Sequence, residues 1–262
     1  MIIIYFLAQS LLPNMLSGNN KPIVDYTTID WIKAFWNYND EMPICYQFWF
    51  IRDLMVVILM SPIIYVAIKK FNVYFVGLIG LVWLLNFNVG VTGISITAIF
   101  FFSVGSLFSI SKYDFLGFLE RIKIVGYIMS VLLIIIEMYL YNSRGSVESI
   151  FSDTLSIVLY KTCTICLMVS CLNITVYALR RAMWKTNEFI YDSNFFIYAY
   201  HTMPLVLFLK LLLRFVHPDS DIRVILIYIT VPFITIIVGL MIFALMRKIF
   251  PRFTMFITGG RK

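Results

Sequence analysis

A small set of ionisable side chains lies inside or at the edge of long apolar runs, where charge is costly unless it faces protein, water or a partner. Such residues indicate a functional site by default, although together they can also form a structural network of ion pairs. Cationic members can stabilise a developing oxyanion, and a histidine can accept or donate a proton near neutral pH. The set comprises Arg52, Asp53, Glu137, Lys161 and His201.

His201 lies in the run FFIYAYHTMPLVLF, where helical spacing places Tyr198, His201 and Leu205 along one face. Pro204 lacks the N–H that would bond the carbonyl of Tyr200 one turn earlier, so a free backbone acceptor is expected there. Two interpretations of the histidine stay open. Either it positions an acceptor or relays a proton, or it is a core residue bonded to a neighbouring helix.

The composition indicates a polytopic membrane protein. Of 262 residues, 61% are apolar and 13% are charged, and the mean hydropathy is +0.90, which excludes an ordinary soluble globular domain. The formal net charge of +7 does not point to nucleic acid, because the lysines and arginines lie in short loops between apolar runs. They act there as orientation signals, and the lipid bilayer is the expected partner.

Residues 48–68 predict one oriented span, because they supply enough helix for a hydrocarbon core of about 30 Å. Trp49 suits one interface, and the two lysines that follow the span mark the cytoplasmic side. Arg52 and Asp53 then lie near the outer surface. They either snorkel to the headgroup level or point inward to a site.

The hydropathy pattern predicts an all-α fold, a transmembrane helix bundle with seven full spans in a single membrane domain. Residues 1–13 form a partial helix, 14–46 an outer loop with an interfacial helix, 47–246 the spans, and 247–262 a basic cytoplasmic tail. The expected spans are 48–68, 71–87, 91–111, 122–141, 155–178, 189–213 and 223–246.

Two segments outside the spans suit the membrane surface. Thr27 and Asp30 are expected to cap a short helix that carries Trp31 and Phe35. The tail 247–262 intersperses basic residues with phenylalanines, which is typical of a segment on the anionic inner leaflet. A solvated tail is the alternative.

The cysteines do not predict a metal site or a disulfide framework. Cys163 and Cys166 form a Cys-x-x-Cys inside an apolar helix with no histidine or acid nearby, and Cys45 and Cys171 stand apart. Small packing residues are expected at these positions. Motifs of soluble enzymes, such as a phosphate loop or a nucleophile elbow, do not occur.

Three runs, in this order along the chain, resemble hallmarks of the bacterial acyltransferase family 3: FWFIRDLMVVILMSP, IFFFSVGSLFS and FFIYAYHTMPLV. The resemblance extends over residues 1–250. It implies a helix bundle in the bacterial cytoplasmic membrane with a cytoplasmic C-terminus. It also implies that a cytoplasmic acyl-CoA donates an acetyl or other acyl group to a hydroxyl of an extracytoplasmic polysaccharide or lipid-linked sugar, without a bound cofactor.

The resemblance also suggests roles for individual residues. His201 and Arg52 are the candidates for catalysis, and His201 would position the acceptor or relay a proton. The candidates for substrate binding are Trp49, Asp53, Glu137, Lys161 and Tyr198.

The chain departs from the family pattern at its N-terminal end. The family carries a histidine eleven positions after a basic residue in its first helix, but position 190, eleven before His201, is isoleucine. The chain is therefore expected to lack the family's first two helices and their general base, so its catalytic residue is unknown and this form is expected to be catalytically incomplete. A transporter or flippase for a lipid-linked saccharide is the rival class. A folded remnant without activity is the third possibility.

Overall fold

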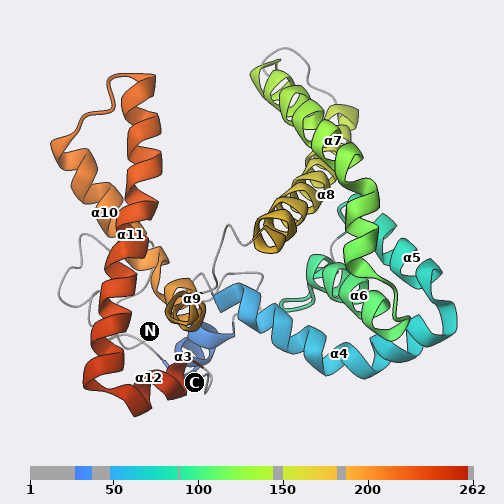
Figure 1. Ribbon diagram of the computed structural model, residues 1–262, viewed down its shortest axis with the longest axis horizontal. Coiled ribbons are helices and arrows are strands. Elements are labelled where there is room, and N and C mark those ends of the chain that lie inside the picture. The colour runs from blue at the N-terminus through green and yellow to red at the C-terminus, as the bar shows by residue number, and fades with distance from the viewer. Residues whose placement is uncertain (1–26, 37–47, 88, 144–149, 182–186, 259–262) are drawn as a thin grey trace. The chain divides into compact units, whose positions relative to one another are not determined.

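The computed structural model describes residues 27–36, 48–87, 89–143, 150–181 and 187–258, which form α-helices and no β-strand. The contacts between residues divide the chain into two compact units, one of residues 51–185 and one of residues 1–50 with 186–262. Figure 1 labels the helices of both units. The expected partial helix at 1–13 and most of the segment 14–46 lie outside the described residues.

Among the described residues, four helices are long and apolar enough to cross a membrane, and they coincide with four of the predicted spans. This confirms the all-helical fold and is consistent with a membrane protein. The four stretches are Trp49–Phe71 (α4), Phe115–Leu140 within α7 (Phe115–Ser143), Thr154–Arg180 within α8 (Ile150–Arg180), and Asp221–Ile249 (α11).

The other three predicted spans differ from expectation. Helix α5 (Val73–Leu84) has 12 residues and α6 (Ile96–Ile110) has 15, which is shorter than the roughly 20 residues that a hydrocarbon core requires. The stretch predicted as one span at 189–213 is a pair of helices, α9 (Glu188–Tyr200) and α10 (Thr202–Phe215), bent by 69°. The described helices therefore do not confirm seven full spans.

Helix caps that the sequence predicted are present in the short helix α3 (Thr28–Phe35). The backbone N–H of Thr27 donates to Oδ2 of Asp30 at 2.8 Å, and the N–H of Asp30 lies 3.4 Å from Oγ1 of Thr27. These reciprocal bonds satisfy donors that the helix start leaves without partners. The predicted cap by Thr27 and Asp30 is confirmed.

In the unit of residues 51–185, α4, α5 and α6 share one apolar core. Val57, Ile64 and Ile68 lie on one face of α4 and pack with Val76 of α5 and with α6. Helix α7 runs along α8 in Figure 1. The Oγ atoms of Ser130 and Ser170 lie 3.3 Å apart, and such small residues let the two backbones approach closely.

In the other unit, α9 packs antiparallel against α11, which is followed by α12 (Pro251–Ile257). Phe196 meets Phe243 with ring centroids 5.6 Å apart, and one turn further along both helices Tyr200 lies beside Gly239. A Cβ atom added at Gly239 would lie 2.6 Å from Cδ1 of Ile197 and 3.0 Å from Cε1 of Tyr200. Glycine is therefore required for this approach.

Gly239→Leu is expected to force α9 and α11 apart, because the new side chain overlaps Ile197 and Tyr200. Overpacking of this kind costs about 1–3 kcal/mol of the free energy of unfolding, and thermal unfolding of the purified chain in detergent measures it. The matched control is Gly77→Leu on α5, where an added Cβ meets nothing within 4 Å. Equal melting temperatures for the two variants would contradict the close approach of α9 and α11.

Candidate functional site

A row of four aromatic rings joins the start of α4 to the break between α9 and α10. The ring centroids of Trp49 and Phe50 lie 6.1 Å apart, Phe50 lies 6.1 Å from Tyr198, and Tyr198 lies 6.1 Å from His201. We call these four residues the ring row. Three of them, Trp49, Tyr198 and His201, are sequence-predicted site residues, and the structure brings them together.

The ring row depends on the break at His201. Helix α9 ends at Tyr200 and α10 begins at Thr202. Pro204, in the first turn of α10, has no N–H to donate to the carbonyl of Tyr200, so the hydrogen-bond ladder is interrupted at this point. His201 lies at this break, and Nδ1 of its imidazole lies 2.7 Å from the carbonyl O of Tyr198.

This contact fixes the tautomer of His201. A carbonyl oxygen only accepts hydrogen bonds, so Nδ1 must carry the proton and donate it. In the neutral ring Nε2 then holds a lone pair, and the hydroxyl Oγ1 of Thr202 lies 3.4 Å from it, a long contact. The arrangement leaves Nε2 as an available proton acceptor.

Arg52 and Asp53 form an ion pair on α4. Nε and Nη2 of Arg52 each lie 3.1 Å from Oδ1 of Asp53, and the two side chains are 11% and 7% exposed. Such burial does not fit an arginine that snorkels to the headgroups. The Nη1 atom of Arg52 is buried and has no hydrogen-bond partner among the described residues. A guanidinium with a free N–H group in an apolar helix suits an anionic ligand.

Lys161 of α8 binds the C-terminal end of α5. Its Nζ donates to the carbonyl O of Trp83 at 2.6 Å and to Oδ1 of Asn86 at 2.8 Å, and it lies 5.2 Å from the centroid of the Trp83 ring. The last carbonyls of a helix have no intrahelical partners and carry partial negative charge. The ammonium group of Lys161 is therefore held by structural contacts.

The end of α5 is shaped by Asn86, whose φ of 58° is left-handed. The N–H of Asn86 bonds the carbonyl of Trp83 at 3.0 Å, and the N–H of Phe87 bonds that of Val82 at 3.2 Å, which is a Schellman motif. Since Lys161 lies seven residues after Thr154, where the candidate span begins, α5 ends about 10 Å inside that span. Sequence analysis missed Trp83 and Asn86, although an asparagine shortly before a glycine signals a helix end.

Glu137 of α7 belongs to a different unit from the ring row. Its Oε1 atom is buried without a hydrogen-bond partner among the described residues. Glu137 shares the unit of residues 51–185 with Arg52, Asp53 and Lys161, whereas the ring row belongs to the other unit. A single pocket that joins all the predicted site residues stays a prediction.

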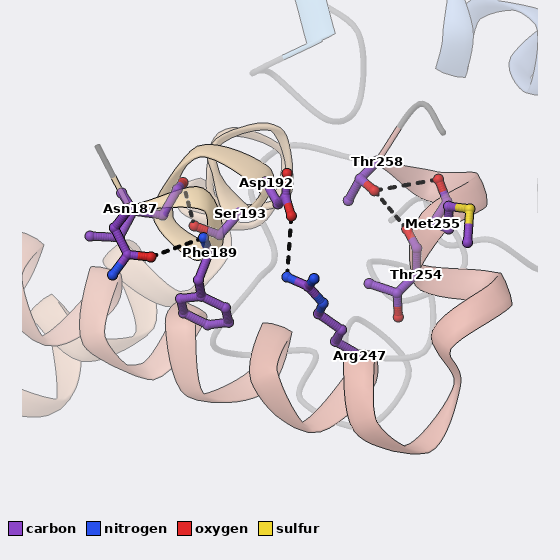
Figure 2. Close-up of polar contacts among 9 residues, drawn as sticks. Asn187, Phe189, Asp192, Ser193, Arg247, Thr254, Met255 and Thr258 are labelled. Carbon is purple, nitrogen blue, oxygen red and sulfur yellow. Dashed lines mark hydrogen bonds and ion pairs between the residues drawn. The ribbon is translucent and has the colours of Figure 1, made fainter. Parts of the chain in front are cut away.

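An ion pair that the sequence did not predict links α9 to the end of α11. Nη1 of Arg247 lies 3.2 Å from Oδ2 of Asp192, whose side chain is 9% exposed, whereas that of Arg247 is half exposed. Figure 2 shows this pair beside the start of α9, where Oδ1 of Asn187 accepts from the N–H of Phe189 at 3.0 Å. The pair holds the helix that carries Tyr198 and His201.

Within the part of the chain that the structure describes, no group of three or more His, Cys, Asp or Glu side chains is placed to hold a metal ion. Cys163, Cys166 and Cys171 are free thiols there, and Cys45 lies outside the described residues.

The contact of Lys161 with Asn86 can be measured by a double-mutant cycle. Asn86→Gly removes the side-chain acceptor and tolerates the positive φ, and Lys161→Met removes the ammonium group. We expect both substitutions to lower thermal stability with a coupling energy of about 0.5–3 kcal/mol. Asn86→Ala should cost more than Asn86→Gly because alanine is strained at this φ. Strict additivity of the cycle would mean that Lys161 does not bind Asn86.

The two partners of the Asp192–Arg247 pair should respond differently to substitution. Arg247→Gln leaves a buried carboxylate without its cation and is expected to cost about 1–3 kcal/mol of unfolding free energy. Asp192→Asn should cost less, because Arg247 is half exposed and can turn to water or to headgroups. Chemical or thermal unfolding in detergent gives the order, and the reverse order would contradict the pairing.

No model of a known protein family matches the chain, and neither does any curated protein or solved structure. What the chain does must therefore be inferred from its residues, their geometry and the resemblance of its motifs.

Proposed function

We propose that the chain is a membrane acyltransferase. It would transfer an acetyl or other acyl group from cytoplasmic acyl-CoA to a hydroxyl of an extracytoplasmic polysaccharide or glycolipid. The proposal includes a bacterial cytoplasmic membrane location, a seven-span arrangement and a cytoplasmic C-terminus, which the distribution of basic residues supports. The order of the three family-like runs supports the reaction class.

One observation carries the proposal: His201 has its Nδ1–H held by the Tyr198 carbonyl at a helix break and presents Nε2 as a base. Acyl transfer to a hydroxyl needs such a group, and because the chain is expected to lack the family's first-helix histidine, His201 is proposed to fill that role. In the proposed step Nε2 takes the proton of the acceptor hydroxyl, and the hydroxyl oxygen forms a bond to the thioester carbonyl carbon. The carbon–sulfur bond then breaks, and the proton passes from the imidazolium to the departing thiolate of CoA.

The ring row provides a surface for the acceptor. Aromatic faces present flat apolar area at low entropic cost, and sugar rings have apolar C–H faces that can stack on them. The Tyr198 ring lies beside that of His201, and Phe50 and Trp49 continue the row, so a sugar held on Tyr198 is proposed to have a hydroxyl near Nε2. Arg52, with its free N–H group, is proposed to bind an anionic part of a substrate.

The test is an acyl-transfer assay on membranes that contain the chain, with acetyl-CoA and a glycan acceptor, following both free CoA thiol and acylated acceptor. His201→Gln is expected to lower transfer by about 100-fold or more, as the loss of a general base does. His217→Gln, at the other histidine of the chain, should leave it unchanged. Transfer that does not exceed that of membranes without the chain, or that survives His201→Gln, would refute the proposal.

A transporter or flippase for a lipid-linked saccharide is the second candidate, and the 69° bend between α9 and α10 favours it. Broken membrane helices line substrate sites in many transporters. The two functions separate in liposomes that contain the chain and a labelled lipid-linked saccharide but no acyl donor. Movement of the saccharide between leaflets under these conditions would favour transport over acyl transfer.

A further inference from the structure

Helix α12 has two chemically different faces. Thr254 and Thr258, four residues apart, are 3% and 5% exposed. On the other side Phe250, Phe253 and Phe256 recur every three residues and are 59%, 56% and 82% exposed. A row of exposed phenylalanines at this spacing forms one apolar stripe along the helix and the residue that precedes it.

The polar side chains on the buried face of α12 have hydrogen-bond partners within the protein. Oγ1 of Thr254 donates to the carbonyl of Phe250 at 3.0 Å, and Oγ1 of Thr258 donates to that of Thr254 at 2.9 Å, as Figure 2 shows for Thr258. Both hydroxyls are thus satisfied within the helix. The phenylalanine stripe is not buried in this way. In water its three large apolar side chains would stay hydrated, which is unfavourable.

The charge beside the stripe has one sign. Lys248 and Arg252 are exposed, and the sequence from Ile222 to Lys262 contains no aspartate or glutamate. Arg247 is already paired with Asp192, so Lys248 and Arg252 are the described cations that this end offers to a partner. An exposed apolar stripe flanked by cations is complementary to an anionic lipid surface.

The position of α12 along the chain also fits a membrane surface. Helix α11 is a candidate span that ends at Ile249, and Pro251 begins α12 directly after it. Phe250, with φ −128° and ψ 62°, breaks the helix between them, and in Figure 1 α12 turns aside from the axis of α11. A chain that leaves the hydrocarbon core at Ile249 has its next residues at headgroup level.

We propose that α12 is a membrane-surface helix that binds anionic lipid. The side chains of Phe250, Phe253 and Phe256 enter the headgroup and acyl boundary, and Lys248 and Arg252 contact lipid phosphates. The partner is the anionic bilayer surface into which α11 is inserted. The inference does not depend on acyl transfer, because it uses only α11, α12 and their charges.

Hydrogen–deuterium exchange of the full chain in nanodiscs tests this. Phosphatidylcholine discs are compared with discs in which part of that lipid is replaced by phosphatidylglycerol. The amides of residues 251–258 should exchange more slowly in the anionic discs. Lys248→Gln and Arg252→Gln should each reduce this slowing of exchange by roughly fivefold. Phe253→Ser with Phe256→Ser should abolish the lipid dependence. High salt should weaken the contribution of the cations.

Matched controls come from the end of α10, where Arg214 and Phe215 are also exposed. Arg214→Gln and Phe215→Ser should leave exchange at 251–258 unchanged. Unchanged exchange in α9 and α11 shows that each variant is folded. Equal exchange of α12 in both kinds of disc would overturn the proposal, and protection that follows protein concentration instead of lipid charge would assign the stripe to a second copy of the chain and overturn it as well.

Discussion

A polar group inside an apolar helix pair has to find its partner within the protein, and the contact of Lys161 with the end of α5 shows how strongly this constrains the fold. Helix α5 has 12 residues, and the last carbonyls of a helix have no partners within that helix. The ammonium group of Lys161 reaches the carbonyl of Trp83 and the side chain of Asn86. The end of the short helix and the ammonium group of Lys161 therefore satisfy each other's hydrogen-bonding needs.

The same constraint acts at His201, with a different outcome. At the break between α9 and α10, Nδ1 of the His201 imidazole donates to the carbonyl O of Tyr198. Because a neutral imidazole has one proton to donate, satisfying the backbone makes the other nitrogen a base. The ring of Tyr198 lies beside that of His201, and Phe50 and Trp49 continue this row of aromatic rings. The chemistry proposed for the site thus depends on a hydrogen bond made at the helix break.

Sequence reasoning predicted the long helices, because continuous hydropathy over about 20 residues is a strong signal. It also predicted the Thr27–Asp30 cap. It expected Pro204 to free the carbonyl of Tyr200 but, because a free carbonyl does not show how far the axis turns, predicted 189–213 as one span, whereas the helices there are bent by 69°. It missed the early end of α5, because an apolar run does not show where a helix stops and the signal at Asn86 is local. The role of Lys161 and the Asp192–Arg247 pair were not predictable, since one sequence does not reveal which helices meet. Burial of Arg52 favoured the interpretation that this residue points inward over the one in which it snorkels to the headgroups.

The tautomer of His201 tests the account most directly. Solid-state nitrogen-15 NMR of the chain in bilayers, labelled at histidine and carrying His217→Gln, observes His201 alone, because the sequence contains two histidines. At a pH where the ring is neutral, we expect a protonated Nδ1 and an unprotonated Nε2. A spectrum with the proton on Nε2 and a bare Nδ1 would contradict the contact with Tyr198 and remove the proposed base.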